Sequence, residues 1–148
     1  MSSDSLISMN HAFGGWNFHL QFTPAFRRDM FRDGVLKEAC ASEAKRIASA
    51  LGIEIGASEF GPDHWHLFVC RCKNYSASQL AQRFKGATSR FLRLHFAERV
   101  RTKLWGNRFW SGGYFAETVG RVTAETVRYY IERQQRKHWE KQSVLSDF

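Results

Sequence analysis

Hydrophobic and polar residues alternate along four short segments of the chain and recur at helical spacing along three longer ones. Alternation is typical of strands, which are expected over residues 16–23, 53–60, 64–72 and 114–118. A spacing of three and four residues is typical of helices, which are expected over residues 35–51, 76–94 and 124–142. The predicted order of elements is therefore β-α-β-β-α-β-α.

Residues at the ends of these helices support the assignment. Gly52 follows the last apolar position of the first helix and suits the left-handed conformation that often ends a helix. Ser76 and Gln79 have the spacing of a capping box, and Thr123 is placed to cap the last helix. The buried stripe of the second helix is expected to consist of Leu80, Phe84, Ala87, Phe91 and Leu94.

The segment Gly61-Pro62-Asp63 separates two predicted strands and is typical of a tight turn, so these strands should form a hairpin. The first six elements then match the ferredoxin-like or RRM-like β-α-β-β-α-β arrangement, an antiparallel sheet with two helices on one face. The last helix is an addition to this α/β (α+β) core. We expect one domain over residues 1–148, with flexible tails at 1–14 and 141–148.

The composition indicates a globular protein with affinity for polyanions. Hydrophobic residues make up 43% of the chain and charged residues 24%. Lys and Arg number 22 against 14 acidic residues, a net charge of +8, which favours nucleic acid as a partner but is also compatible with simple solubility. Aromatic residues reach 15%, and rings beside cations suit unpaired bases, although most of them must belong to the core.

The chain carries no signal for export or for a membrane. No apolar run approaches the ~20 residues of a membrane span. Residues 1–10 lack the basic start and apolar centre of a signal peptide. The three cysteines, Cys40, Cys70 and Cys72, are too few for a secreted disulfide framework. A cytoplasmic location without membrane contact is expected.

The most distinctive local feature is His64-Trp65-His66, directly after the turn. Residues two apart on a strand point to the same face, so both imidazoles can reach one ion. Neutral imidazole is a good ligand for a borderline divalent metal. Taken alone, such a pair is more often two ordinary histidines of a hairpin.

A zinc site that adds Cys70 and Cys72 to the two histidines is excluded by distance. On a continuous strand all four residues would share one face, but His64 and Cys72 would lie about 26 Å apart. The two cysteines are therefore expected to be small core residues.

On the last predicted helix, Tyr130 and Gln134 lie four residues apart and so project from one face. A tyrosine can attack phosphorus and form a phosphotyrosine ester, which divides one difficult transfer into two reversible steps. A glutamine amide can supply an oxygen ligand to a metal. The alternative is that Tyr130 packs beside Val127 and Ile131 with its hydroxyl at the edge.

Together these residues resemble a known family, the single-tyrosine HUH transposases of bacterial and archaeal insertion sequences (TnpA type, IS200-like). The resemblance covers roughly residues 16–140. It rests on five motifs that occur in family order: Gly61-Pro62-Asp63-His64-Trp65-His66-Leu67, Leu80-x3-Phe84-Lys85-Gly86-x2-Ser89-Arg90, Leu104-Trp105-Gly106-x3-Trp110-Ser111-x-Gly113-Tyr114-Phe115, Val119-Gly120 and Tyr130-Ile131-Glu132-x-Gln134.

The resemblance implies a homodimeric DNA transposase that binds hairpins at the ends of a mobile element in single-stranded DNA. Such enzymes cleave and rejoin strands with Mg2+ or Mn2+, through a 5′-phosphotyrosine and a free 3′-OH. By this match His64, His66 and Gln134 are the metal ligands and Tyr130 is the nucleophile. The resemblance also implies that active sites can be shared between the two subunits.

Two residues depart from the family pattern. Trp65 is larger than the aliphatic residue usual between the two histidines, and we expect it on the core face. Tyr129 adjoins Tyr130 and is a second candidate nucleophile, but adjacent helix residues point about 100° apart and only Tyr130 shares a face with Gln134.

Basic and aromatic residues outside this site are candidates for contact with DNA, or alternatively for a solvated surface and the core. The basic candidates are Arg27, Arg28, Arg83, Lys85, Arg90 and Arg93. Trp105, Phe109 and Trp110 are expected in the core or at a dimer seam rather than against bases.

Two rival functions remain to be weighed. The first is a domesticated relative with the same chemistry that processes repeated genomic hairpins. The second is a non-catalytic RRM-like module that binds nucleic acid. RRM domains carry aromatic residues in a Lys/Arg-Gly-Phe type of strand motif, and its absence here counts against the binding module.

Overall fold

The structure is a computed structural model that describes residues 16–146, with side chains from 16 to 136. It contains four strands, three long helices, one short helix and two 3-10 turns. Their bounds are β1 Asn17–Phe22, η1 Ala25–Arg27, η2 Met30–Arg32, α2 Gly34–Leu51, β2 Glu54–Gly61, β3 His64–Cys70, α3 Ala77–His95, α4 Ala97–Arg101, β4 Phe115–Val119 and α5 Ala124–Ser146.

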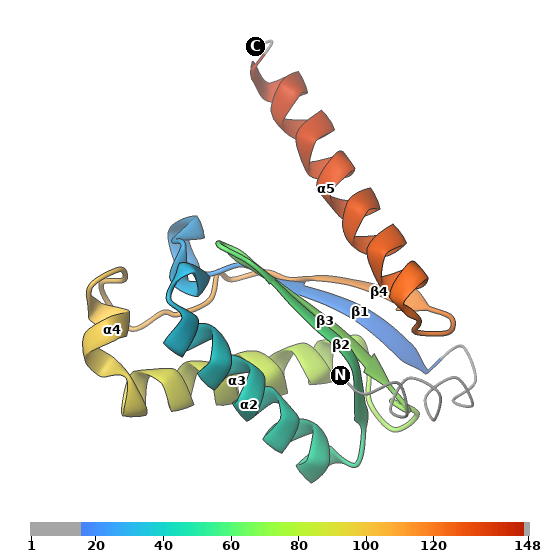
Figure 1. Cartoon of the computed structure of the whole chain (residues 1–148), viewed down its shortest axis with the longest axis horizontal. Helices are drawn as coiled ribbons and strands as arrows, with labels where there is room; N and C mark the ends of the chain where they lie inside the picture. Colours follow the sequence, from blue (N-terminus) through green and yellow to red (C-terminus); the bar gives the residue numbers. More distant parts are fainter. Residues whose placement is uncertain (1–15, 147–148) are drawn as a thin grey trace.

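The strands form one antiparallel sheet in the order β2-β3-β1-β4 (Figure 1). The predicted hairpin is confirmed, since β2 and β3 pair directly and only Pro62 and Asp63 lie between them. Strand β1 is central and pairs with both β3 and β4. This order is that of the ferredoxin-like fold, which confirms the predicted fold class.

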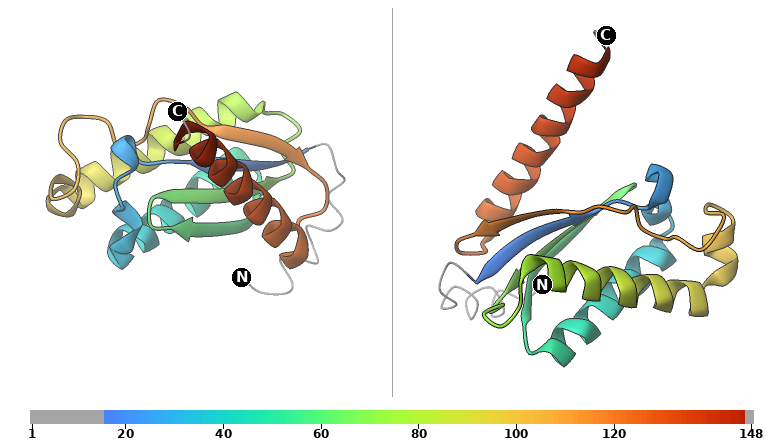
Figure 2. Two further views of the ribbon diagram at one scale, coloured as in Figure 1. Left: turned by 90° about the horizontal axis from the view of Figure 1, so that it is seen from above. Right: turned by 180° about the vertical axis from the view of Figure 1, so that it is seen from behind.

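The two faces of the sheet are covered differently. Helices α2 and α3 lie on one face, whereas α5 begins on the other face and projects away from it (Figures 1 and 2). The main core lies between the sheet and α2 and α3, where Leu20, Phe22, Trp65 and Leu67 are fully buried. The expected core position of Trp65 is thus confirmed.

The predicted helix ends are confirmed as well. Gly52 follows α2 in a left-handed conformation with φ of 72°, and Ser76 and Gln79 form the capping box of α3. The Thr126 amide donates to the Thr123 hydroxyl at the start of α5. Asp33, which the sequence analysis did not single out, accepts hydrogen bonds from the first turn of α2.

Several expectations need correction. Leu94 is 71% exposed and does not belong to the core. Phe109 and Trp110 are buried as expected, whereas Trp105 is 82% exposed, which excludes the core for it and leaves the dimer seam as its expected position. The α3 stripe is instead Leu80, Ala81, Phe84, Thr88 and Leu92. Helix α5 continues to Ser146, four residues beyond its predicted end and into the segment expected to be a tail. The other expected tail, residues 1–14, lies outside the described residues.

The three cysteines are buried free thiols, in agreement with the sequence. A search of the described helices finds none with the length and apolar character required to cross a membrane.

Candidate active site

Strand alternation divides β3 between the core and a polar site. Trp65 points into the core and donates a hydrogen bond from its indole N–H to the Ser58 hydroxyl. His64 and His66 therefore point to the opposite face, where their ring centroids lie 5.0 Å apart. The sequence prediction that these two imidazoles share one face is confirmed.

His64 is oriented by the residue before it and by a glycine. Its Nδ1 lies 2.9 Å from Oδ1 of Asp63, and Asp63 also pairs with Arg27 at 3.2 Å. Burial tends to raise the pKa of Asp63, but the hydrogen bond from His64 and the charge of Arg27 outweigh it, so this pKa lies below its ordinary value. The His64 ring lies against Gly61, where a Cβ atom would approach it to 2.1 Å.

His66 is held by a chain of contacts from β1 and β4. Its Nδ1 lies 2.9 Å from Nε2 of His19, and Nδ1 of His19 lies 3.1 Å from Oε1 of Glu117. The other carboxylate oxygen of Glu117 accepts a hydrogen bond from Arg133 of α5. The other ring nitrogen of His66, Nε2, is buried and has no hydrogen-bond partner among the described residues.

Burial favours the neutral form of both of these imidazoles. It lowers the pKa of His66 to about 3, with smaller contributions from the charges of His19 and His64. Burial also lowers the pKa of His19, although the hydrogen bond and charge of Glu117 raise it. A neutral imidazole has a free lone pair on one nitrogen, which is the form that binds a metal.

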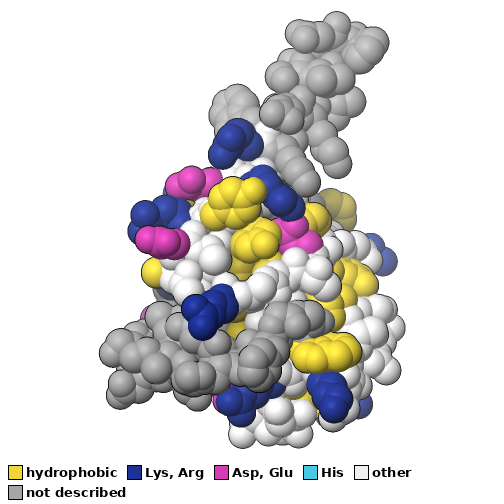
Figure 3. All heavy atoms as spheres, turned by 90° about the vertical axis from the view of Figure 1, so that its right-hand side faces the viewer, with side chains coloured by type: hydrophobic (Ala, Val, Ile, Leu, Met, Phe, Trp, Pro, Cys, Tyr) yellow, Lys and Arg dark blue, Asp and Glu magenta, His cyan; other side chains and the backbone are white. Residues whose placement is uncertain are grey.

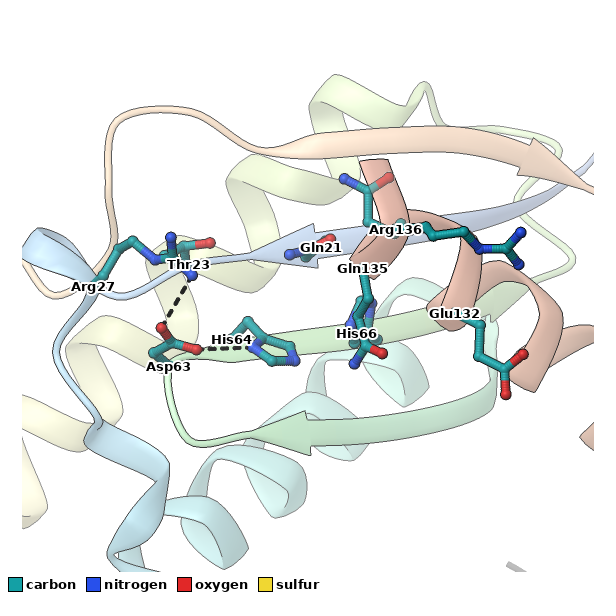
Figure 4. A pocket seen from close by; sticks show the side chains of 10 residues that line it. Gln21, Thr23, Arg27, Asp63, His64, His66, Glu132, Gln135 and Arg136 are labelled. Carbon is teal, nitrogen blue, oxygen red and sulfur yellow. Dashed lines mark hydrogen bonds and ion pairs between the residues drawn. The ribbon is translucent and has the colours of Figure 1, made fainter. Parts of the chain in front are cut away.

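The two histidines open into a pocket between the sheet and α5, which we call the histidine pocket (Figure 4). Its volume is about 590 Å³, within the range of small-ligand sites. It is lined by Gln21, Thr23, Arg27, Asp63, His64, His66, Glu132, Gln134, Gln135 and Arg136. Gln134 thus lines the same pocket as the histidines with which the family motif groups it.

Tyr130 lies beside this pocket and does not line it. Its ring centroid is 6.2 Å from that of His19 and 6.5 Å from that of Phe68, and Arg133 stacks over it at 5.5 Å. Tyr130 therefore packs on the sheet, as the alternative interpretation of this tyrosine expected. Tyr129 is 56% exposed.

The two cysteines after the histidines do not share a face. Arg71 adopts a left-handed conformation with φ of 62°, which ends the strand and breaks its alternation. Cys70 consequently packs with Phe68 on the α5 side, whereas Cys72 packs in the main core. Both are buried, so their expected role as small core residues is confirmed, although the expectation of one common face is wrong.

The donor atoms of the histidine pocket fit a divalent cation. The Nε2 atom of His66 is buried and has no partner among the described residues, which costs about 1–3 kcal/mol unless something binds it. Among the residues that the structure describes, no group of three or more His, Cys, Asp or Glu could hold a metal. Gln134, whose side-chain amide offers an oxygen, lines the same pocket as the two histidines.

The basic candidates for DNA contact do not gather at the histidine pocket. Arg27 lines the pocket, and the next residue in the chain, Arg28, is exposed. The other four belong to α3 on the far side of the sheet: Arg83, Lys85, Arg90 and Arg93. On the face at the foot of α5, the described Lys and Arg side chains stand apart, with acidic and hydrophobic ones between them (Figure 3).

Two of the α3 residues, Lys85 and Arg93, differ in their contacts within the chain. The Lys85 ammonium donates to the backbone carbonyls of Ser111 and Gly113, at 2.8 and 3.2 Å. The Nε and Nη2 atoms of Arg93 are buried and have no partner in the described part of the chain. Lys85 therefore fastens the loop before β4 to α3 in this structure.

The sequence analysis missed three polar residues of this site. His19 and Gln21 lie on the face of β1 opposite to Leu20 and Phe22, and Glu117 is the cross-strand neighbour of His19 on β4. The Oε1 atom of Gln21 is buried, lacks a partner among the described residues and belongs to a pocket-lining residue. The available signal was the run of polar residues at every second position of a central strand.

Comparison with known proteins supplies a family. The family model described as "Transposase IS200 like" matches residues 13–134. The transposase for insertion sequence element IS200 of Salmonella typhimurium is 30% identical over 121 residues, which cover 80% of this chain and 78% of that protein. The ISDra2 transposase TnpA of Deinococcus radiodurans is 27% identical over 120 residues, covering 81% and 84%.

Solved structures agree with this result. A crystal structure from Deinococcus radiodurans R1, assigned as a transposase, matches with a TM-score of 0.60 and 25% identity over 80% of this chain and 89% of that one. The REP-associated tyrosine transposase, solved bound to a REP hairpin, matches with a TM-score of 0.54 and 12% identity. It covers 81% of this chain and 64% of its own, and it supports the fold alone.

Proposed function

The chain belongs to the family of IS200-like transposases, and we propose that it cleaves and rejoins single-stranded DNA through a phosphotyrosine at Tyr130. The observation that carries this proposal is the histidine pocket, where His64 and His66 share a cavity with Gln134, one helical turn after the tyrosine. Membership of this family implies a DNA-processing enzyme, and the histidine pocket contains residues suited to cleavage of a phosphodiester.

The reaction that we propose is an exchange of esters at phosphorus. The Tyr130 oxygen forms a bond to the scissile phosphorus while the bond from phosphorus to the 3′ oxygen breaks. The leaving strand takes up a proton and ends in a 3′-OH, and the other strand carries its 5′-phosphate on Tyr130. Because the new ester conserves the bond energy, a second 3′-OH can reverse the step and join strands without a nucleotide cofactor.

We further propose that His64, His66 and Gln134 hold a Mg2+ or Mn2+ ion. A bound divalent ion would orient the phosphate and neutralise the charge that develops on its oxygens. Two imidazole nitrogens with one amide oxygen form a donor set that suits Mn2+, whereas Mg2+ prefers oxygen. The unpartnered lone pair of His66 supports this assignment.

The position of the two tyrosines favours Tyr130 as the nucleophile. Tyr130 is on the side of α5 that faces the sheet, together with the half-buried Ile131, whereas Tyr129 faces solvent. Tyr130 does not reach into the histidine pocket of its own chain in this conformation. We therefore propose that the enzyme is a homodimer in which α5 of one subunit can complete the pocket of the other.

The test of the nucleophile is a covalent adduct. The protein would be incubated with Mn2+ and a pool of single-stranded stem-loop oligonucleotides with randomised flanks, and adducts resolved on a denaturing gel. We expect an adduct that Tyr130→Phe abolishes and that the matched control Tyr129→Phe retains. An adduct lost with Tyr129→Phe instead would move the nucleophile to Tyr129, and a pool that binds without any adduct would favour a non-catalytic binding module.

The metal site is tested separately by calorimetry with Mn2+. Replacing His64 and His66 together by Ala should abolish binding, because the two nitrogens that carry the free lone pairs are removed. Unchanged Mn2+ affinity in this double variant would overturn the ligand assignment while leaving the tyrosine chemistry open to its own test.

A further inference from the structure

His66 is the end of a chain of polar contacts that no family motif includes. The chain runs from Arg133 of α5 to Glu117 of β4, then to His19 of β1 and to His66 of β3. It therefore connects four elements of the fold, and His19 and Glu117 are separated by 98 residues in sequence. His19 is fully buried, and its ring is stacked on Phe68 with centroids 4.3 Å apart and planes 2° from parallel.

The chemistry of the donors determines where the protons lie along this chain. Glu117 is paired with the Arg133 guanidinium, and an ionised carboxylate only accepts hydrogen bonds, so Nδ1 of His19 must donate to it. A neutral His19 then has a bare Nε2, which can only accept. The proton between the two rings must therefore belong to Nδ1 of His66, and this leaves Nε2 of His66 without a proton.

We propose that His19 and Glu117 are positioning residues that fix His66 in the tautomer whose Nε2 is free to bind the divalent cation. This inference rests on the metal site of the proposed function and assigns two residues to its outer shell. Metal-binding histidines generally donate their second N–H to a carboxylate or carbonyl group, which fixes the ring and raises its basicity. His64 has such a partner in Asp63, and His66 has one in Glu117, with His19 inserted between them.

The two outer-shell contacts differ in rigidity. Asp63 lies in the turn, 28% exposed, and is shared with Arg27. His19 is enclosed between Phe68 and Phe115, and both partners of its hydrogen bonds belong to strands that pair with β1. The His66 ring is therefore the more firmly held of the two proposed ligands.

The direct test measures the tautomer in metal-free protein. Long-range proton–nitrogen NMR spectra of a sample with ¹⁵N-labelled histidine report which ring nitrogen carries the proton. We expect His66 to be protonated at Nδ1 in the wild-type chain and to lose this preference in His19→Phe, which keeps the stacked ring but offers no acceptor. Protonation of His66 at Nε2 in the wild type, or an unchanged tautomer in His19→Phe, would overturn the proposal.

The second measurement is Mn2+ affinity by calorimetry. His19→Phe should weaken binding by about 10- to 100-fold, the usual effect of losing an outer-shell partner. His19→Gln should recover part of this loss, because its amide can accept from His66 and donate to Glu117. The matched control is His95→Phe, an exposed histidine on α3, for which no change is expected.

A second variant keeps the proposal testable if His19→Phe does not fold. Glu117→Gln preserves the shape of a half-buried side chain but removes the charge that fixes the His19 tautomer, and we expect weaker Mn2+ binding and a mixed His66 tautomer. If Glu117→Gln kept both the wild-type Mn2+ affinity and the wild-type His66 tautomer, the positioning role of His19 and Glu117 would be contradicted. If the double variant of His64 and His66 still bound Mn2+, the proposed metal site itself would be wrong. The tautomer measurement would still decide whether His19 and Glu117 fix the protonated nitrogen of His66.

Discussion

The clearest consequence of the site geometry concerns Gly61, the last residue of β2. A Cβ atom at this position would lie 2.1 Å from Cε1 and 2.4 Å from Nε2 of His64. The first distance is 1.3 Å short of the 3.4 Å at which ordinary contacts begin. Gly61→Ala should therefore force the His64 ring out of its position, since its three nearest atoms all belong to that ring.

The size of this displacement decides the expected effect. Protein ligands must lie within about 0.2 Å of the ideal metal distance, so a ring that moves by more than an ångström no longer binds. Losing one imidazole should cost at least as much as losing an outer-shell partner, or about tenfold in Mn2+ affinity, which corresponds to about 1.4 kcal/mol. Calorimetry with Mn2+ measures the loss, and thermal unfolding checks that the hairpin is retained.

A matched control separates the ring displacement from a general effect of losing a glycine. Gly34, at the start of α2, has nothing within 4 Å of its added Cβ, so Gly34→Ala should bind Mn2+ as the wild-type chain does. The reasoning would be refuted if Gly61→Ala folded normally, kept the NMR signals of the His64 ring and bound Mn2+ with unchanged affinity.

Two further predictions concern side chains that shape the scaffold. Lys85→Met removes two hydrogen bonds to the loop at residues 111–113 and should destabilise the fold by about 1–3 kcal/mol in urea unfolding, and little change would show that solvent replaces them. Asp33→Ala should cost about 0.5–2 kcal/mol through the lost cap of α2, with Asp33→Asn as the variant that keeps the cap. Burial tends to raise the pKa of Asp33, but the hydrogen bond from Arg99 lowers it below its ordinary value. Wild type should therefore be more stable than Asp33→Asn above the ordinary carboxyl pKa. This difference in stability should vanish as the pH falls through the lower pKa of the folded state. An advantage that persisted in strong acid would contradict the ion pair as its source.

Local sequence signals predicted much of the fold. The alternation of β3 placed Trp65 in the core and both histidines on the other face, because period two in a strand follows directly from backbone geometry. The capping box at Ser76 and the glycine after α2 act through neighbours only a few residues away. Such features depend on short stretches of chain, so a single sequence is sufficient to identify them.

Features that depend on packing were harder to predict. Leu94 continues the apolar spacing of α3 but is exposed near the end of the helix, where α4 turns away. The left-handed residue Arg71 moved Cys72 to the other face of the sheet, and no glycine marked that position. The error at Leu94 arose in the last turn of its helix, and the error at Cys72 arose just past the end of its strand.

The residues that contact the two histidines also differ in how well the sequence predicts them. Asp63 adjoins His64 in sequence, so its contact could be inferred from the turn. Glu117 reaches His66 only through His19, and this requires that β4 pairs with β1 in the correct register. The alternation of polar residues on β1 could have marked His19 and Gln21 as a polar face, but only the sheet order shows what lies opposite to them.

The described side chains of the helix that carries Tyr130 are less buried than those of the other two long helices. Six side chains of α2 and five of α3 are buried, whereas Val127 is the one buried side chain among residues 124–136 of α5. Burying a valine contributes about 1.5–3 kcal/mol, and a partly exposed ion pair such as that of Arg133 adds about 0–1 kcal/mol. Together with the partly buried Tyr130 and Ile131, these contacts give the described part of α5 less burial than α2 or α3 has. Since Tyr130 does not line the histidine pocket, the proposed attack requires α5 to be repositioned, and the contact between Arg133 and Glu117 is one that this movement must break.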